Sequence, residues 1–283
     1  MSAKRTALIT GASSGFGLLT TITLAKRSWR VIATMRDLSR RERLEAAARK
    51  ANVLDRIEFL ALDVTNAAQI AELAAQIAAR PAKLDALVNN AGFAMAGFAE
   101  DVSDEELRRQ FETNFFGAAT VTRAFLPQLR RQRSGHIVML SSISGRMGFP
   151  GISSYAAAKY ALEGWAESLR LEVAALGIRV ALVEPGSFQT DIWTRNATIA
   201  AGMLDANSPN AGRLARWRKN IENGKPKANP QIVANGIAAI LENPHPPLRT
   251  VFGRDAKMAL LLRRLLPSSL FERLLLRLSG MDD

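Results

Sequence analysis

Residues 6–20 read TALITGASSGFGLLT, which is a short apolar run, a glycine-rich turn and the beginning of a helical pattern. Glycine permits a tight turn and a close approach of the backbone to a diphosphate, while a helix N-terminus offers free N–H groups and partial positive charge. A glycine cluster alone also serves ordinary strand-to-helix turns. This one follows a first strand and opens a first helix, which is the context that a nucleotide site requires. The turn residues expected to contact a dinucleotide are Gly11, Ser13, Ser14, Gly15, Phe16 and Gly17.

The same alternation continues along the chain to about Gly253. Short apolar or β-branched runs alternate with longer segments of helical period, the pattern of a parallel sheet covered by helices on both faces. The expected strands are Thr6–Thr10, Arg30–Thr34, Ile57–Leu62, Ala86–Val88, His136–Leu140, Val180–Val183 and Arg249–Phe252. The expected helices span about 15–27, 39–51, 66–79, 103–131 with a break, 154–176 and 229–242. We therefore predict an α/β fold, a doubly wound parallel sheet of the Rossmann type with about seven strands, in a single domain over residues 1–253.

Two segments depart from this alternation. Residues 187–229 contain glycines, prolines and asparagines among scattered large apolar residues, and irregular segments of that length are typical of lids and binding loops. We expect this insertion to cover the substrate. Residues 254–283 are basic and rich in leucine, and Pro267 divides them into two short helices. We expect an amphipathic extension that packs on the same domain.

Composition excludes several classes of site. The 283-residue chain has no cysteine and only two histidines, His136 and His245, neither with a carboxylate or serine partner at a recognisable spacing. We therefore expect no metal site, disulfide or thiolate chemistry. No apolar run reaches the roughly 18 residues of a membrane-spanning helix, and the first strand begins too early to leave room for a signal peptide, so we expect a cytoplasmic location. The net charge of +12 indicates a solvated basic surface, and no nucleic-acid-binding signature accompanies it.

The glycine spacing TGxxxGxG resembles that of the short-chain dehydrogenase/reductase family. Further motifs of this family follow in the same order, and the resemblance covers roughly residues 5–253. They are Asp63 in LDVT, Asn89–Gly92 (NNAG), Asn114, Ser142, Tyr155–Lys159 (YAAAK) and Pro185–Gly186. Several motifs in register are far more specific than any one of them. The resemblance implies an oxidoreductase that interconverts a carbonyl and a hydroxyl group with a nicotinamide cofactor.

Tyr155 and Lys159 are four residues apart, so on a helix they lie on the same face. Taken alone, YAAAK is also simply a good helix sequence with a surface tyrosine and lysine. Ser142 favours the functional interpretation, because it ends the fifth strand where parallel α/β sheets bind ligands. A phenol has a pKa near 10, so it needs a shift of about three units to act as acid and base near neutrality. A nearby ammonium has the right sign to lower that pKa.

The family resemblance assigns roles to these catalytic residues. It implies that Tyr155 transfers the proton to or from the substrate oxygen, and that Lys159 lowers the tyrosine pKa and holds the nicotinamide ribose. It also implies that Ser142 hydrogen-bonds the substrate oxygen and that Asn114 holds a water connecting Lys159 to solvent. Ser141 is the rival of Ser142, but in this family the active serine lies thirteen residues before the tyrosine.

The resemblance also extends the cofactor site. It implies further contacts from strand ends, with Asp63 and Val64 near the adenine, Asn90, Ala91 and Gly92 along its ribose, and Pro185, Gly186 and Thr190 beside the carboxamide.

The choice between NAD and NADP depends on the end of the second strand. An acidic side chain there would accept from the ribose 2′-hydroxyl, whereas a basic one would pair with a 2′-phosphate. Met35 occupies the acidic position and Arg36 follows it, which favours NADP over NAD. Asp37 beside them either weakens this effect or caps the next segment.

The segments that follow the strand ends around the nicotinamide are apolar. They supply Phe93, Met95, Phe98, Met147, Phe149, Trp193, Met203 and Trp217. Beside Ser142 and Tyr155, the substrate contacts expected from this set are Phe93, Met147, Phe149 and Trp193. Such a lining favours a bulky apolar carbonyl, steroid-like, retinoid-like or aryl-alkyl. Within the family, ATMRD after the second strand and the basic, leucine-rich C-terminus look most like the hydroxysteroid and retinol dehydrogenase branch.

Two other function classes stay open. One is a binding or scaffold protein that kept the fold and lost the chemistry, against which the intact set of four catalytic residues argues. The other is a basic peripheral protein that contacts acidic lipid through its amphipathic tail. Because family members are commonly dimers or tetramers, we expect a homodimer or homotetramer. Trp165 and Leu169 on the tyrosine helix suit such an interface and an ordinary core equally well.

Overall fold

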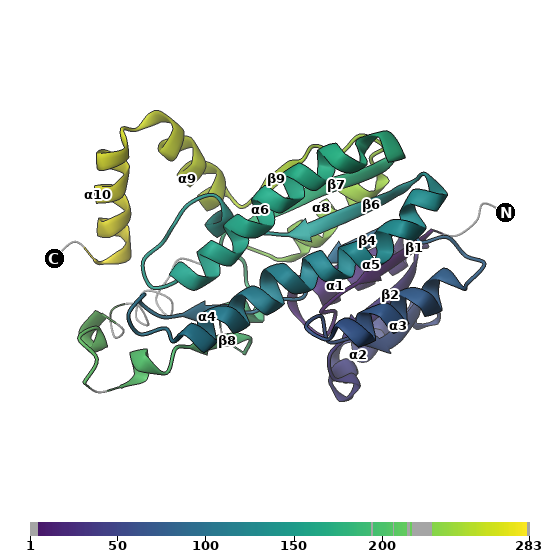
Figure 1. Cartoon of the computed structure of the whole chain (residues 1–283), viewed down its shortest axis with the longest axis horizontal. Coiled ribbons are helices and arrows are strands. Elements are labelled where there is room, and N and C mark those ends of the chain that lie inside the picture. Colours follow the sequence, from purple (N-terminus) through teal and green to yellow (C-terminus); the bar gives the residue numbers. More distant parts are fainter. Residues whose placement is uncertain (1–4, 194, 206, 214–215, 217–227, 282–283) are drawn as a thin grey trace.

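The computed structural model describes residues 5–193, 195–205, 207–213, 216 and 228–281. At its centre is a seven-stranded sheet in the order β3-β2-β1-β4-β6-β7-β9, in which all neighbouring strands run parallel (Figure 1). The strands are β1 (Thr6–Ile9), β2 (Arg30–Met35), β3 (Ile57–Ala61), β4 (Ala86–Asn89), β6 (Gly135–Leu140), β7 (Ile178–Pro185) and β9 (Arg249–Phe252). The predicted fold class is confirmed, with all seven expected strands in the sheet.

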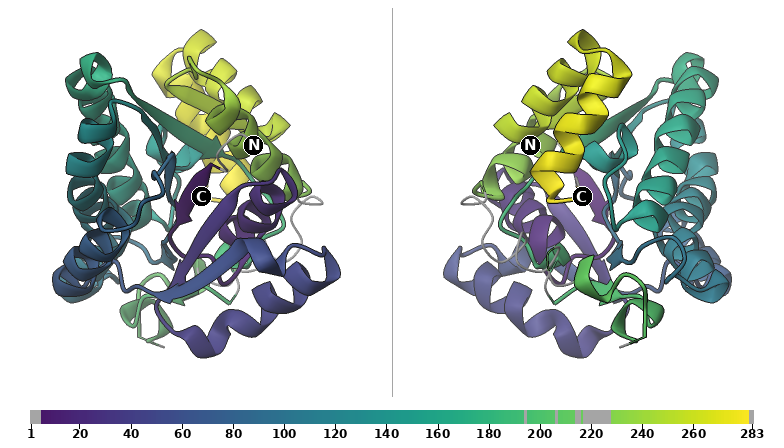
Figure 2. Two further views of the ribbon diagram at one scale, coloured as in Figure 1. Left: turned by 90° about the vertical axis from the view of Figure 1, so that its right-hand side faces the viewer. Right: turned by 90° about the vertical axis from the view of Figure 1, so that its left-hand side faces the viewer.

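Helices cover both faces of the sheet (Figure 2). The helices on one face are α1 (Gly15–Lys26), α2 (Glu42–Lys50) and α8 (Gln231–Glu242), and those on the other are α3 (Ala67–Ala78), α5 (Gly117–Gln132) and α6 (Ser153–Val173). A sheet that is covered on both faces has no water-facing side, so its strands are continuous apolar runs. Accordingly, β1 and β4 are buried along their whole length.

The order of the strands reverses at the centre of the sheet, between β1 and β4. The chain builds β1 to β3 outward on one side, returns, and then builds β4, β6, β7 and β9 on the other. At such a switch point the loops that leave the two central strands diverge and open a crevice at the carboxyl ends of the strands. The glycine-rich turn after β1 and the segment after β4 therefore lie side by side.

The break expected within residues 103–131 is a π-helical turn, Glu112–Phe116 (η3), which separates α4 (Asp104–Phe111) from α5. π-helical turns inside α-helices are frequent at functional sites, because the extra residue re-aims a side chain. Asn114 stands inside this turn and is almost completely buried. The local irregularity therefore orients one of the predicted catalytic residues.

A second, two-stranded parallel sheet was not predicted from the sequence. It pairs β5 (Ala94–Ala96) with β8 (Ala197–Ile199), and β8 belongs to the 187–229 segment that was expected to be irregular. Each strand has only three residues, too few for a periodic signal, so the pairing depends on tertiary contact. Leu214 and Trp217 of the same segment lie outside the described residues.

The C-terminal extension forms α9 (Arg254–Leu265) and α10 (Ser268–Ser279), divided where the proline was expected to divide them (Figure 1). Apolar side chains attach both helices to the body of the protein. Phe271 is buried in a cluster with Met147 from the loop after β6, and Met281 is buried near the segment that follows β5. Within the described ranges, no helix is long and apolar enough to cross a membrane.

Candidate active site

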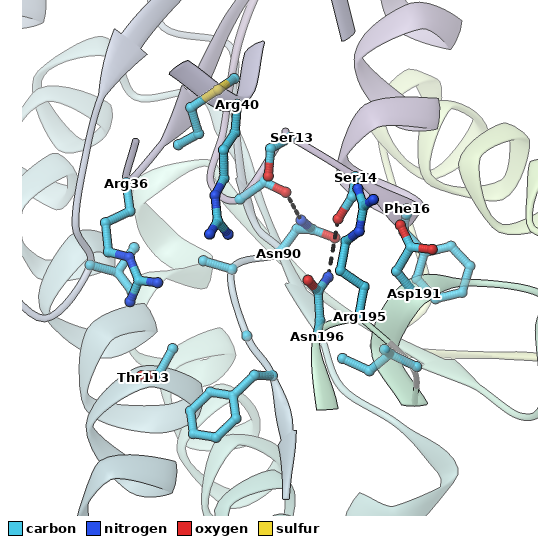
Figure 3. Close-up of a pocket in the computed structure, with 18 of the residues that line it drawn as sticks. Ser13, Ser14, Phe16, Arg36, Arg40, Asn90, Thr113, Asp191, Arg195 and Asn196 are labelled. Carbon is cyan, nitrogen blue, oxygen red and sulfur yellow. Dashed lines mark hydrogen bonds between the residues drawn. The ribbon is translucent and has the colours of Figure 1, made fainter. Parts of the chain in front are cut away.

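A pocket with a volume of about 440 Å³ lies where the segments after β1, β2, β3, β4 and β7 converge (Figure 3). Of the residues predicted to bind the cofactor, those that line it are Gly11, Ser13, Ser14, Gly15, Phe16, Arg36, Asp63, Val64, Asn90, Ala91, Gly92 and Thr190. The predicted cofactor residues outside its lining are Gly17, Tyr155, Lys159, Pro185 and Gly186. The tertiary structure thus brings most of the predicted cofactor contacts, from five separate segments, around one space.

The turn after β1 requires Gly11 and Gly17 for two different reasons. Gly11 has a φ of +66°, and a Cβ there would lie 2.7 Å from the Cα of Ala91. A Cβ at Gly17 would collide with the carbonyl oxygen of Gly11. Asn90 holds the turn in place, since its Nδ2 donates to the carbonyl oxygens of Thr10 (2.8 Å) and Gly11 (2.9 Å). The turn is therefore a fixed cradle at the start of α1, where free N–H groups favour an anion.

Two arginines stand at the end of β2. Met35 is buried, whereas Arg36 and Arg40 are exposed and both line the pocket (Figure 3). Asp37 also borders the pocket, but one of its oxygens accepts from the backbone N–H (2.9 Å) and the hydroxyl (2.7 Å) of Ser39. These hydrogen bonds hold the pKa of the Asp37 carboxyl below its usual value. Of the two alternatives for Asp37, the structure favours the cap of the next helical turn.

The chain that follows β7 contributes side chains to the opposite side of the pocket (Figure 3). Arg195 and Asn196 line it, and Asn196 Nδ2 donates to the Ser14 hydroxyl over 3.1 Å. Nearby, Asp191 Oδ2 lies 2.6 Å from Nη1 of Arg43 on α2. Sequence reasoning missed Arg195 and Asn196, because they lie in the long segment after β7, just before β8, and no motif marks them.

Tyr155 and Lys159 lie one turn apart on α6, and both are buried. Ser142, which follows β6, forms a side-chain hydrogen bond with Tyr155. Lys159 Nζ donates to the carbonyl oxygen of Leu140 over 2.7 Å. Ile192 lines the pocket and also packs in the apolar cluster that contains Tyr155. Three of the four predicted catalytic side chains therefore form one group that adjoins the pocket.

Burial moves the pKa values of the tyrosine and the lysine in opposite directions. It raises the pKa of Tyr155 to about 12, and the hydrogen bond with Ser142 offsets only part of this rise. Burial lowers the pKa of Lys159 to about 8, against the attraction of the Glu163 carboxylate, which raises it. The cost of desolvating a phenolate thus dominates, and the protein's own groups shift the tyrosine pKa away from neutrality instead of toward it.

Asn114 fixes the loop after β4. Its Nδ2 donates to the carbonyl oxygen of Phe93 over 2.9 Å, and its Oδ1 accepts from the backbone N–H of Phe93 over 3.1 Å. The side chain therefore holds the backbone of Phe93 in position. Ser141, the rival of Ser142, is buried with its hydroxyl against the backbone of Gly145, so the geometry favours Ser142 as the serine beside Tyr155.

The predicted substrate residues lie in different places. Phe93 lines the pocket, and Phe149 packs on the cluster around Tyr155. Met147 is almost fully buried in the cluster that attaches the C-terminal helices. The side chain of Trp193 lies outside the part of the chain that the structure describes. The apolar surroundings of Tyr155 therefore come from Phe149, Ala94, Ile152 and Ile192.

Pro185 and Gly186 stand where the C-terminal extension meets the sheet. Pro185 ends β7, and the Asp255 carboxylate of α9 accepts from the backbone N–H of Ser187 over 2.7 Å. A Cβ on Gly186 would lie 2.6 Å from both oxygens of that carboxylate. Gly186 is therefore required by this close approach, independently of any contact with a cofactor.

Comparisons with known proteins agree with this architecture. The chain matches the family model described as short chain dehydrogenase over residues 5–199. The uncharacterized oxidoreductase YusZ of Bacillus subtilis is 42% identical over 277 residues, which cover 96% of this chain and 97% of YusZ. Human retinol dehydrogenase 8 is 37% identical over 257 residues, covering 88% of this chain and 81% of its own. A crystal structure of a short-chain dehydrogenase from Streptomyces avermitilis has a TM-score of 0.81 at 36% identity, covering 99% of this chain and 100% of that chain.

Two further solved structures contain a nicotinamide cofactor. A short-chain dehydrogenase/reductase from Burkholderia phymatum in complex with NAD is 25% identical, with a TM-score of 0.78 and 93% of each chain covered. ElxO with NADP bound is 26% identical, with a TM-score of 0.71, covering 88% of this chain and 97% of that chain. Because the family match spans most of the chain and relatives align over nearly its full length, the chain belongs to the short-chain dehydrogenase family of oxidoreductases.

Proposed function

We propose that the chain is an NADP(H)-dependent oxidoreductase that interconverts a ketone or aldehyde with the corresponding alcohol by hydride transfer. The observation that carries this proposal is the hydrogen bond between the side chains of Ser142 and Tyr155, with Lys159 one turn further along α6. A proton donor, a hydroxyl that can hold the same substrate oxygen, and a cation are the groups that acid–base catalysis on a carbonyl needs. A scaffold protein would have no use for this arrangement.

The pocket suits a dinucleotide with a 2′-phosphate. Any side chain at Gly11 or Gly17 would collide with the backbone, so the turn after β1 has bare backbone at these two positions. The N-terminus of α1 attracts an anion. Arg36 directly follows β2, Arg40 lies in the next helical turn, and both line the pocket, where a phosphate would accept charge-assisted hydrogen bonds. Met35 offers no carboxylate to the ribose hydroxyls that NAD would present. We therefore favour NADP over NAD.

The chain's own residues handle the proton, while the bound nicotinamide supplies or accepts the hydride. With a pKa of about 12, Tyr155 stays protonated at neutral pH, so in reduction it can donate its proton to the carbonyl oxygen. Ser142 orients that oxygen by a hydrogen bond. In this mechanism Lys159 has to be an ammonium, because it would stabilise the remaining phenolate and would hold the nicotinamide ribose. Oxidation of an alcohol follows the same steps in reverse, with the phenolate as base.

The proposed substrate is a bulky apolar carbonyl or alcohol, steroid-like, retinoid-like or aryl-alkyl. Phe149, Ala94 and Ile192 pack around Tyr155, so a substrate reaches the proton donor past apolar side chains. Burying apolar ligand surface contributes roughly 25 cal/mol per Å², whereas a charged acid would lose hydration without a partner. The similarity to retinol dehydrogenase 8 supports the same class.

A screen of carbonyl substrates graded by size and polarity tests this function. NADPH consumption is followed for each compound, with NADH in parallel. We expect lipophilic ketones and aldehydes to have the highest kcat/KM and NADPH to be preferred. A preference for sugars or short hydroxy acids would overturn the substrate class. Tight NADPH binding without turnover of any compound would favour the scaffold function.

We also propose a homodimer or homotetramer that forms through the outer face of α6. Leu169 belongs to the core and Trp165 packs partly against it, but Tyr160 and Leu171 on the same helix are exposed. Size-exclusion chromatography with light scattering tests this assembly, and a monomeric mass at micromolar concentration would contradict it.

One feature of α9 favours an additional contact with anionic lipid. Met258, Leu261 and Leu265 form an exposed apolar stripe at helical spacing, on the face opposite to the one that packs on the body. Lys257 and Arg264 flank this stripe and complement the charge of an anionic bilayer. We therefore propose peripheral binding of α9 to such a surface.

Co-sedimentation with vesicles of phosphatidylserine and phosphatidylcholine at low salt tests this contact. Binding should disappear in Leu261→Glu and with vesicles of phosphatidylcholine alone. A chain that stays in the supernatant, or a Leu261→Glu variant that changes oligomeric state instead, would exclude it.

A further inference from the structure

A buried charge cluster of two glutamates and two arginines lies beside the lysine turn of α6. We define it as Glu163, Glu184, Arg146 and Arg249. Nε of Arg249 lies 3.0 Å from Oε2 of Glu163 and 3.4 Å from Oε1 of Glu184. Nη1 of Arg146 lies 3.1 Å from the same oxygen of Glu184. Both glutamates are almost completely buried, which is costly for carboxylates unless they are paired. Their presence in a core position therefore needs a physical reason.

Glu163 is the member of the buried charge cluster that lies next to Lys159 on α6. The two residues are one turn apart on the same face of α6, and both are buried. Gly145 packs directly on this turn, since a Cβ there would lie 2.9 Å from Cγ of Glu163 and 3.1 Å from the carbonyl oxygen of Lys159. Among the described residues, Oε1 of Glu163 has no hydrogen-bond partner. Within the described part of the chain, no hydrogen bond therefore offsets the burial of this oxygen.

The electrostatic effect of Glu163 on Lys159 opposes that of burial. Burial alone would push the lysine toward its neutral form, and its pKa falls to about 8 even though the Glu163 carboxylate raises it. Without that carboxylate the lysine pKa would fall further, toward neutral pH. Arg249 in turn pairs with Glu163, which fixes the position of the Glu163 carboxylate.

We propose that Glu163 is a positioning residue that keeps Lys159 in its ammonium form, and that the ion pair with Arg249 holds the Glu163 carboxylate in place for this purpose. The proposal deepens the proposed function and rests on it, because only there does Lys159 need its charge to stabilise the Tyr155 phenolate. Glu163 does not line the pocket, so it would act through the lysine.

The groups that face this turn of α6 come from several elements. α6 itself contributes Tyr155 on the preceding turn, and β6 contributes the Leu140 carbonyl oxygen that accepts from the lysine. Glu184 of β7, Arg249 of β9 and Arg146 after the turn that follows β6 form the rest of the buried charge cluster. The α4 and η3 segments also pack on α6, and the polar residues that they bury, Gln110 and Asn114, are uncharged.

Glu167 provides a matched control for Glu163. It also bonds Arg249, with 2.8 Å between its Oε2 and Nη2, but it lies a turn farther from Lys159 and is exposed. The experiment compares Glu163→Gln with Glu167→Gln, each alone and combined with Lys159→Met. Glutamine preserves the shape of the side chain and can still accept from Arg249, which keeps two other carboxylates.

Two readouts follow the charge of Lys159. The first is the alkaline limb of the kcat/KM profile for carbonyl reduction, which should move to lower pH by about one unit in Glu163→Gln and stay in place in Glu167→Gln. The second needs no cofactor. Because the folded-state pKa of Lys159 lies below its ordinary value, Tm should rise with pH once the lysine loses its proton, and this rise should begin at lower pH in Glu163→Gln.

The Lys159→Met background distinguishes positioning from packing. If Glu163 acts through the lysine, Glu163→Gln should leave the pH dependence of Tm unchanged when residue 159 is methionine. An equal effect of Glu163→Gln in both backgrounds, or no shift in either readout, would overturn the proposal. If no carbonyl is turned over but Tm shows the expected shift, the proposed function fails while the electrostatic link between the two residues stands.

Discussion

The ammonium nitrogen of Lys159 lies 5.8 Å from the centroid of the Tyr155 ring, yet its hydrogen bond goes to the carbonyl oxygen of Leu140. The end of β6 therefore fixes the position of the lysine, with its nitrogen close to the tyrosine ring. With pKa values of about 12 and about 8, both side chains are protonated at neutral pH. Under the proposed function, the phenol would donate its proton while a cation stands beside the anion that forms.

Tyr155→Phe should lower kcat/KM by about 10²- to 10⁴-fold, because it removes the transferable proton and little else. NADPH binding and Tm should be nearly unchanged. The chain has one other tyrosine, Tyr160, which is exposed on the same helix and accepts from Arg263 over 3.1 Å, so Tyr160→Phe is the matched control. Steady-state kinetics give kcat/KM for both variants. Substantial turnover by Tyr155→Phe would refute the mechanism.

Arg36→Asp should lower the preference for NADPH over NADH by at least about tenfold, because a phosphate would lose a charge-assisted partner and meet a negative charge. Arg41→Asp is the control, since Arg41 pairs with Glu45 and does not line the pocket. The ratio of kcat/KM for the two cofactors is the measurement. If the ratio stays the same in Arg36→Asp, this arginine is not part of the cofactor site.

Arg195→Ala should weaken NADPH binding by roughly tenfold, the usual worth of one hydrogen bond to a charged group. Arg195 lines the pocket on the side opposite to Arg36. Arg43→Ala is the control, because Arg43 binds Asp191 at the surface but does not line the pocket, and exposed ion pairs contribute little. Fluorescence titration gives both Kd values. Equal losses in the two variants would mean that Arg195 only helps to dock the segment.

Lys159→Met should change how stability depends on pH. The ordinary lysine pKa is 10.5, and that of Lys159 in the folded chain is about 8. Between these pH values the unfolded chain binds more protons than the folded one, so the free energy of unfolding of the wild type rises with pH. Methionine does not titrate. The free energy of unfolding of the wild type should therefore increase relative to that of the variant between these pH values, by an amount on the order of a few kcal/mol. Urea unfolding at several pH values measures this, and a pH-independent difference would contradict it.

Gly17→Ala and Gly164→Ala should have opposite effects. The added Cβ at position 17 collides with the Gly11 carbonyl oxygen, so the cradle must open, with lower Tm and weaker NADPH binding. Gly164 is exposed in α6 and no heavy atom lies within 4 Å of an added Cβ, so alanine should stabilise the fold by about 0.5–1 kcal/mol. Chemical denaturation and cofactor titration test both changes. Unaltered NADPH binding by Gly17→Ala would separate this turn from the diphosphate.

The sequence by itself determined the features that depend on neighbours in the chain. Strand and helix periods, the glycine turn and the spacing of Tyr155 and Lys159 are local, because side chains four residues apart on a helix always share a face. The seven strands, the broken helix and the divided C-terminal extension could therefore be predicted correctly. The roles of the catalytic and cofactor residues stay predictions, which the variants above would test.

Only the tertiary structure decided what depends on burial and on contacts between distant segments. Arg195 lies just before β8, which pairs with β5, and it lines the pocket although nothing near it in the sequence marks it. Met147 packs against the C-terminal helices α9 and α10. Arg249 lies on β9, 86 residues after Glu163, and pairs with it. The upward shift of the Tyr155 pKa also depends on the tertiary structure. It follows from the loss of hydration, which is set by all the residues that surround the phenol and cannot be predicted from the local sequence.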